Sequence, residues 1–359
     1  VLVVTFFSFL LLLSGTPYRR TWKVSKEKAP REKEHGMDRI LTLGRLASLG
    51  LALVAAPSRG GEIEDPSPWV LAWHDEFDGQ ALDGARWDHD IGNGYYSYDA
   101  NQWISGWGNG ELQYYTREPS NAFVEGGRLH LRAHKESLHG CGYTSARLKT
   151  RRNDGTALFN QMYGRFEFRA LLPTGQGLWP ALWMMPQDDT YGPWAASGEI
   201  DIMEARGQEP RAVFGAVHFG ARWPAHTQAS WEYKLPDEQT IGEFHVYAIE
   251  WEPGVIRWSV DGHTCATQSF WWSSSQTDGS KGVRPGREAD LNPWPAPFDR
   301  PFYIIINLAV GGNFAGNPDR HTRFPAEMLV DYVRVYRKKA GEGPLPARGK
   351  GELPFHAGN

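Results

Sequence analysis

Three carboxylates lie within six residues near the middle of the chain, in a run at positions 199–204 that reads EIDIME. Acidic and apolar residues alternate at its start, which favours a half-buried strand with Glu199 and Asp201 on one face. Glu204 lies five positions after Glu199, so a regular strand would turn it towards the core. Because a buried charge without a partner is costly, we expect a β-bulge at Met203 that returns Glu204 to the carboxylate face.

Two facing carboxylates can divide the work of cleaving a glycosidic bond, one ionised as the nucleophile and the other protonated as the general acid. Retaining enzymes hold these groups roughly 5 Å apart, whereas Cα atoms four strand positions apart are separated by about 13 Å. Two long Glu side chains leaning inward over a concave, bulged strand could close much of that gap. The structural alternative is a solvated strand face whose acids pair with Lys or Arg. The flanking Gly198 and Gly207 argue against a helix.

The EIDIME run resembles the E-x-D-x-x-E signature of glycoside hydrolase family 16, in its bulged, laminarinase-like form. The resemblance extends from about Trp73 to Arg337 and includes further motifs in the expected order. These motifs are WHDEFDG at 73–79, GWGNGELQYY at 106–115, YTSAR at 143–147, WPALWMMP at 179–186 and VDYVRVY at 330–336. Six ordered motifs are a specific signal.

The family resemblance implies an all-β fold, a β-jelly-roll sandwich of two antiparallel sheets with a carbohydrate groove across the concave one. The composition independently favours short strands and tight turns, with 13% aromatic residues, 40 glycines and 24 prolines. No long helical period is visible, and Glu252-Pro253-Gly254 predicts a hairpin turn. Strands are expected at 128–134, 163–171, 212–219, 244–251, 255–261, 302–310 and 329–336.

The resemblance also implies roles for single residues. Glu199 would be the nucleophile and Glu204 the general acid, while Asp201 would hold the nucleophile and separate the two pKa values. Trp179 and Trp183 share a strand face and would line the subsites beside the cleaved bond, although an arbitrary Trp is more often a core residue. Residues expected to hydrogen-bond sugar hydroxyls are Asn109, Arg147 and His218, with Trp107, Asn313 and Trp271-Trp272 as plausible groove neighbours.

The substrate is less sharply indicated than the chemistry. The bulged signature resembles enzymes that cut β-1,3-glucan internally, with mixed-linkage β-1,3-1,4-glucan as a further substrate. Agarases and carrageenases share the bulge, so a galactan hydrolase is one alternative. A non-catalytic β-glucan-binding protein of the same fold is another, but such relatives have lost catalytic acids and this chain retains all three.

The N-terminal residues are excluded from the predicted fold. Residues 1–36 are expected to be an upstream, non-native extension, with translation starting at Met37. Residues 37–58 have the order of a signal peptide, which predicts a secreted or periplasmic protein. The competing interpretation takes Val1 as an alternative start with its own signal or anchor. The catalytic domain is expected at 66–338 and a flexible tail at 339–359.

The net charge of −4 becomes about −9 once residues 1–56, which carry +5, are set aside. A negative net charge gives no support for binding to nucleic acid, or to a membrane in the mature protein. We expect a monomer whose partner is a neutral polysaccharide. Catalysis of this kind requires no cofactor. The resemblance suggests a structural calcium ion with Glu76 and Asp331 among its ligands, although surface acids are an equally simple interpretation. Whether Cys141 and Cys265 form a disulfide is left open.

Overall fold

The computed structural model describes residues 68–276 and 282–339. All of them belong to one of two compact units, residues 61–359; the other, residues 1–60, lies outside the described residues, as do the predicted signal peptide and nearly all of the predicted tail. No helix in the described part is long and apolar enough to cross a membrane.

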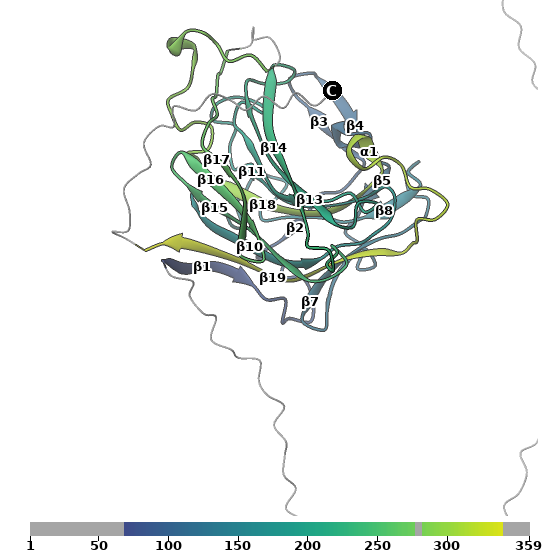
Figure 1. Cartoon of the computed structure of the whole chain (residues 1–359). Coiled ribbons are helices and arrows are strands. Elements are labelled where there is room, and N and C mark those ends of the chain that lie inside the picture. The colour runs from purple at the N-terminus through teal and green to yellow at the C-terminus, as the bar shows by residue number, and fades with distance from the viewer. Residues whose placement is uncertain (1–67, 277–281, 340–359) are drawn as a thin grey trace, which may run out of the picture. The chain divides into compact units, whose positions relative to one another are not determined.

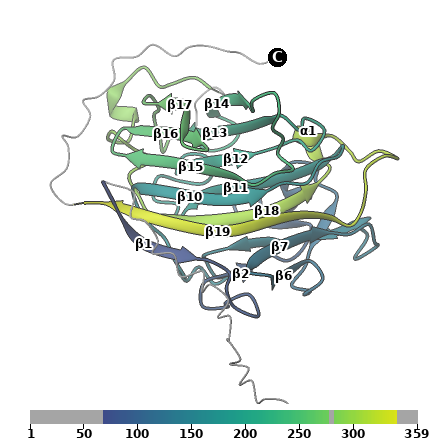
Figure 2. The same cartoon turned by 60° about the horizontal axis from the view of Figure 1, so that its bottom comes forward.

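Two antiparallel sheets are stacked on one another, as the jelly-roll prediction requires (Figures 1 and 2). The larger sheet contains, in spatial order, β17 (His263–Gln268), β16 (Val255–Val260), β15 (His245–Glu252), β10 (Gly164–Leu171), β19 (Ala326–Lys338), β7 (Arg128–Ala133) and β6 (Ala122–Glu125), and β1 (Trp69–Asp75) also pairs with β19. The second sheet contains β14 (His226–Lys234), β13 (Ala212–Gly220), β12 (Glu199–Glu204), β11 (Leu178–Pro186), β18 (Phe302–Val310), β9 (Arg147–Lys149) and β2 (Asp88–His89).

Smaller elements decorate this sandwich. The antiparallel hairpin β3 (Gly94–Ser97) and β4 (Gln102–Ser105), and the parallel pair β5 (Gln113–Tyr115) and β8 (Tyr143–Ser145), complete the strands. The only α-helix in the described residues is α1 (Gly312–Ala315), and 3-10 turns occur at Gly106–Gly108 and Glu288–Asp290. The predicted strands all form, and β15 and β16 are joined by the turn expected at Pro253-Gly254.

Period-two alternation explains how the core forms between the sheets. In β10, buried positions alternate with half-buried ones, so that Phe166, Phe168 and Ala170 face the second sheet. In β12, the apolar residues Ile200, Ile202 and Met203 are buried in the same core. The carboxylates of β12 therefore face the other way, onto the outer surface of the second sheet.

The predicted bulge lies in β12. Against β11, Leu182 pairs with Met203 and Trp183 pairs with Asp201, which leaves Ile202 as the extra residue. Against β13, the register shifts between Asp201 and Glu204. Ile202 and Met203 are both buried, so the strand inserts two consecutive apolar side chains into the core and brings Glu204 back to the carboxylate face. The bulge was thus predicted correctly, to within one residue.

One expectation about single residues needs correction, and one open question is answered. Trp271 and Trp272 do not lie beside the acids: both are buried in the core, Trp271 stacks on Trp294 with 5.0 Å between ring centroids, and the pocket that they line is formed with residues 284–296. The two cysteines do not form a disulfide. Cys265 lies in the edge strand β17 and Cys141 in the segment after β7; four strands of the larger sheet separate β17 from β7, and both thiols are free.

The glycine before the carboxylate strand is required by its surroundings. Gly198 has φ +87°, a conformation that side chains with a Cβ adopt at a cost of roughly 1–2 kcal/mol. A Cβ at this position would lie 2.8 Å from Cε1 of Phe298, which is fully buried. Gly198 therefore lets the chain enter β12 tightly against Phe298.

We expect Gly198→Ala to lower the free energy of unfolding by about 2–4 kcal/mol, through backbone strain together with overpacking. Chemical denaturation measures this difference. Gly142→Ala is the matched control, because no atom lies within 4 Å of a Cβ there and its φ is ordinary; it should stay within about 0.5 kcal/mol of the parent. Equal stability of the two variants would contradict the packing argument.

Candidate active site

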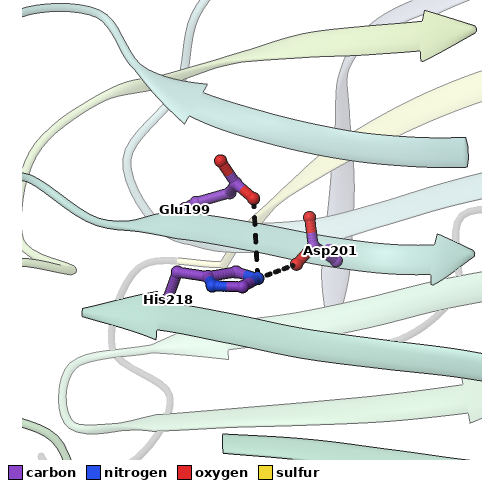
Figure 3. Close-up of side chains that lie close together, drawn as sticks. All are labelled: Glu199, Asp201 and His218. Atoms are coloured by element: carbon purple, nitrogen blue, oxygen red, sulfur yellow. Dashed lines mark ion pairs between the residues drawn. The ribbon is translucent and has the colours of Figure 1, made fainter. Parts of the chain in front are cut away.

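The three predicted acids lie together on the concave face of β12, beside His218 of β13. Figure 3 shows that the carboxylates of Glu199 and Asp201 both point to the same nitrogen of the His218 imidazole. His218 Nε2 lies 3.2 Å from Asp201 Oδ2 and 3.7 Å from Glu199 Oε1. The Asp201 side chain is only 5% exposed, so a charge on its carboxylate is stabilised by His218 rather than by water.

Each catalytic glutamate accepts a hydrogen bond from a different indole. Trp194 Nε1 donates to Glu199 Oε2 at 2.8 Å, and Trp179 Nε1 donates to Glu204 Oε1 at 2.9 Å. Indole is a donor only, so each bond stabilises the ionised form of its carboxylate and fixes the orientation of its side chain. Trp179 was predicted from its place in the alternating WPALW run, whereas Trp194 was missed.

Burial dominates the acidity of the two glutamates. It raises the pKa of Glu204 to about 8 and that of Glu199 to about 7, and repulsion from Asp201 acts in the same direction in both. The His218 cation opposes this rise at both glutamates, together with the Trp194 hydrogen bond at Glu199 and the Trp179 hydrogen bond at Glu204. Desolvation therefore favours the protonated form of both carboxyl groups, and a glutamate that holds its proton near neutral pH is what general acid catalysis requires.

His218 acts as the cation of this cluster. Burial by itself lowers its pKa, but Glu199, Asp201 and Glu204 together raise that pKa to about 9. A protonated His218 forms ion pairs with Asp201 and Glu199 and partly neutralises them. In the described residues, Glu199, Asp201 and His218 are also the one group of three whose ligand atoms, within 4.8 Å of one another, could hold a metal ion. A metal there would occupy the nucleophile.

The floor beside the acids is built from residues that share a register across the strands. Arg147 of β9 pairs with Asn307 of β18, which pairs with Ala181 of β11, which in turn pairs with Glu204. Trp183 Nε1 donates to Asn307 Oδ1 at 2.7 Å. This row places the predicted sugar-binding residues Arg147 and Trp183 on one side of β12, and it includes Asn307, which was not predicted.

Arg147 is held in place by stacking and charge. Its guanidinium lies 4.7 Å from the ring centroid of Trp183 and 4.4 Å from that of Trp107, and its Nε is 2.9 Å from Asp90 Oδ2. Trp107 therefore lies beside Arg147, and its place in a sugar-binding groove stays a prediction. A guanidinium held between two indole rings is a rigid donor for hydroxyl groups.

Asn109 lies at the same side of the site, in the loop after the 3-10 turn. Its Nδ2 donates to Glu111 Oε1 at 3.1 Å, and its carbonyl accepts a hydrogen bond from the backbone N–H of Asn313 at 2.7 Å. Asn313 in α1 is followed by Phe314, whose ring lies 5.1 Å from that of Trp179. The loop that carries Asn109 is therefore joined to α1, whose Phe314 packs beside Trp179.

Glu76 and Asp331, the residues expected to bind calcium, are each paired with arginine side chains. Arg334 makes two hydrogen bonds to the Glu76 carboxylate, at 2.9 and 2.8 Å, and Asp331 accepts one from Arg169 at 2.6 Å with Arg128 at 3.5 Å. Guanidinium partners compete with a dication for the same oxygens, so these carboxylates as placed do not fit a calcium site. Calcium binding stays a prediction without support from either residue.

An antiparallel sandwich that carries two desolvated glutamates on one sheet face, with Trp and Arg side chains beside them, has the arrangement expected of a glycoside hydrolase. The family model "Glycosyl hydrolases family 16" matches residues 109–271, and a second model, "Beta-glucan synthesis-associated protein SKN1/KRE6/Sbg1", matches residues 225–343. The chain belongs to glycosyl hydrolase family 16.

Curated relatives agree with this assignment. The chain is 44% identical over 280 residues to glucan endo-1,3-beta-glucosidase A1 of Niallia circulans, an alignment that covers 75% of this chain and 38% of that protein. It is 44% identical over 303 residues to a beta-glucanase of Rhodothermus marinus, covering 82% and 94% of the two chains. The solved laminarinase from Rhodothermus marinus superposes with a TM-score of 0.60 at 42% identity, covering 76% and 98%.

The two indole hydrogen bonds lead to a prediction about pH. If activity needs an ionised Glu199 and a protonated Glu204, kcat/KM is bell-shaped in pH. Trp194→Phe removes a bond that favours the Glu199 carboxylate, so its pKa rises and the acidic limb moves to higher pH, by about one unit. Trp179→Phe raises the pKa of Glu204 in the same way and moves the alkaline limb to higher pH instead.

Complete pH–rate profiles of the two variants test this pair of shifts. Trp183→Phe is the matched control, because its indole donates to Asn307 and not to a carboxylate; it should leave both limbs in place. If both variants shifted the same limb, or if Trp183→Phe shifted one equally, the separate roles of the two indoles would be refuted.

Proposed function

We propose that this chain hydrolyses internal β-1,3 linkages of a laminarin-like glucan with retention of configuration, and that mixed-linkage β-1,3-1,4-glucan is a further substrate. The observation that carries the proposal is the bulged strand β12, which presents Glu199 and Glu204 on one face, each with its own indole donor. Its similarity to proteins named as endo-1,3-beta-glucosidase and laminarinase supports the choice of linkage.

The reaction proceeds in two steps on these side chains. The Glu199 carboxylate attacks the anomeric carbon while Glu204 gives its proton to the leaving oxygen, so the glycosidic bond breaks and a glycosyl ester forms on Glu199. Glu204, now ionised, takes a proton from water, and that water displaces Glu199 from the sugar. His218 lies within ion-pair distance of both Glu199 and Asp201, so its cation compensates the charge of the nucleophile and holds the two carboxylates in place throughout.

We expect Glu199→Gln to reduce turnover by about a thousandfold or more, because the amide cannot form the ester, while oligosaccharide binding persists. Hydrolysis rates together with calorimetric binding to a short β-1,3-glucan oligosaccharide measure the two effects separately. Glu238→Gln, at an exposed carboxylate outside the site, is the control and should behave as the parent. Near-normal activity of Glu199→Gln would remove this residue from its role.

Incubation of the purified protein with laminarin, lichenan and agarose distinguishes the alternative substrates. We expect laminarin to yield short oligosaccharides early in the reaction, and agarose to yield none. Release of galactan fragments would support the galactan-hydrolase alternative. Binding of laminarin without any product would support a non-catalytic glucan-binding protein.

We also propose that the protein is exported and acts as a monomer. The support for export is the order of charged, apolar and small residues at 37–58, which is typical of a signal peptide. N-terminal sequencing of the protein recovered from outside the cell would locate a cleavage site near residue 58, and light scattering would give its mass in solution.

A further inference from the structure

Exposed aromatic side chains are concentrated on the hairpin formed by β3 and β4. Eight large hydrophobic side chains are exposed in the described residues, and four of them belong to this one short ribbon: Tyr95, Tyr96, Tyr98 and Trp103. Tyr98 is 87% exposed and Trp103 is 52% exposed. All four are Tyr or Trp, which combine a flat apolar ring with a polar edge.

The hairpin has two different faces. Tyr95 and Ile104 are directly opposite each other, and the side chains of both lie next to Gly108, within 4 Å of where a Cβ of that residue would be. The Tyr95 ring also lies 6.3 Å from that of Trp107, the residue that stacks on Arg147 beside the catalytic groove. This inner face therefore anchors the ribbon to the wall of the groove.

The outer face presents the remaining rings together. Tyr96 and Trp103 form a directly opposed cross-strand pair, and Tyr98 makes an edge contact with Tyr96 at 5.1 Å. The Tyr96 hydroxyl donates to Asn101 Oδ1 at 2.6 Å, which fixes the ring that joins the other two. An ordered aromatic surface without aliphatic side chains, edged by hydroxyl and amide groups, suits the apolar faces and polar rims of sugar rings.

We propose that the outer face of this hairpin, the surface of Tyr96, Tyr98 and Trp103, is a second binding site for a β-glucan chain, outside the catalytic groove. The occupant is inferred from continuity, since the same ribbon forms part of the groove wall through Tyr95 and Trp107. Figure 1 shows β3 and β4 on the same side of the sandwich as β14 and α1, which is the side of the concave sheet. A polymer entering the groove therefore passes this surface.

The proposal relies on the function inferred above for the choice of polymer, and binding can be measured without turnover. In a Glu199→Gln background, we expect Tyr98→Ala combined with Trp103→Ala to reduce sedimentation with insoluble β-1,3-glucan particles by about five- to tenfold. Met162→Ala, which removes an exposed apolar side chain elsewhere, is the control and should sediment as the parent. Both changes are at exposed side chains, so circular dichroism should be unchanged.

A second measurement separates this surface from the groove. In the active enzyme, the double variant should hydrolyse a short soluble β-1,3-glucan oligosaccharide within twofold of the parent rate and insoluble glucan several-fold more slowly. Unchanged sedimentation would overturn the proposal, as would an equal loss of activity on the short substrate. A change in oligomeric state in the variant would also overturn it, because the surface would then be a contact between copies of the chain. If the parent sediments with glucan but does not cleave it, only the proposed function fails.

Discussion

The crowding of three carboxylates on one desolvated strand face is the constraint on which the rest of the site depends. Burial of Glu199 and Glu204 away from water raises the pKa of both glutamates, and repulsion from Asp201 adds to this rise. A strand with this sequence is tolerable only because other elements bring compensating groups to it. His218 comes from β13, Trp179 from β11 and Trp194 from the segment that precedes β12.

These compensating groups are positioned by rigid sheet geometry rather than by loops alone. Glu199 is directly opposite His218 in the ladder between β12 and β13, so their side chains share a face. The bulge then aligns Glu204 with Ala181, whose small side chain leaves room above the sheet for the carboxylate. The buried Ile202 and Met203 hold the bulge in place from the core side, so packing and chemistry are fixed by the same residues.

Much of this arrangement could be predicted from the sequence, because alternation reports directly on which face a strand residue occupies. The bulge followed from the five-residue spacing of Glu199 and Glu204, and Trp179 and Trp183 followed from their spacing of four. Trp194 could not be found in this way, since it lies in an irregular segment where no period relates it to Glu199. Asn307 was hidden for a different reason: β18 is buried throughout and carries no alternation to mark its single groove-facing amide.

The calcium expectation and the two buried tryptophans show the limit of transferring a pattern from a family. Glu76 follows β1 and Asp331 lies within β19, yet their oxygens accept hydrogen bonds from Arg334, in the VDYVRVY motif itself, and from Arg169 of β10. Trp271 and Trp272 lie in an irregular segment and still pack inward, because burial of an indole is favourable wherever the core offers space. In each of these cases the position of the side chain depends on contacts with residues far away in the sequence.

The roles of the two glutamates also follow from an asymmetry that the EIDIME motif does not contain. The His218 cation lies 3.7 Å from Glu199, so attraction to it favours the ionised nucleophile directly. Glu204 follows the bulge in β12. It accepts a hydrogen bond from the neutral indole of Trp179, and burial raises its pKa, which favours its protonated form. The shorter distance from the His218 cation to Glu199 agrees with the proposed roles of Glu199 as nucleophile and Glu204 as acid, and those roles require His218 to remain protonated during the reaction.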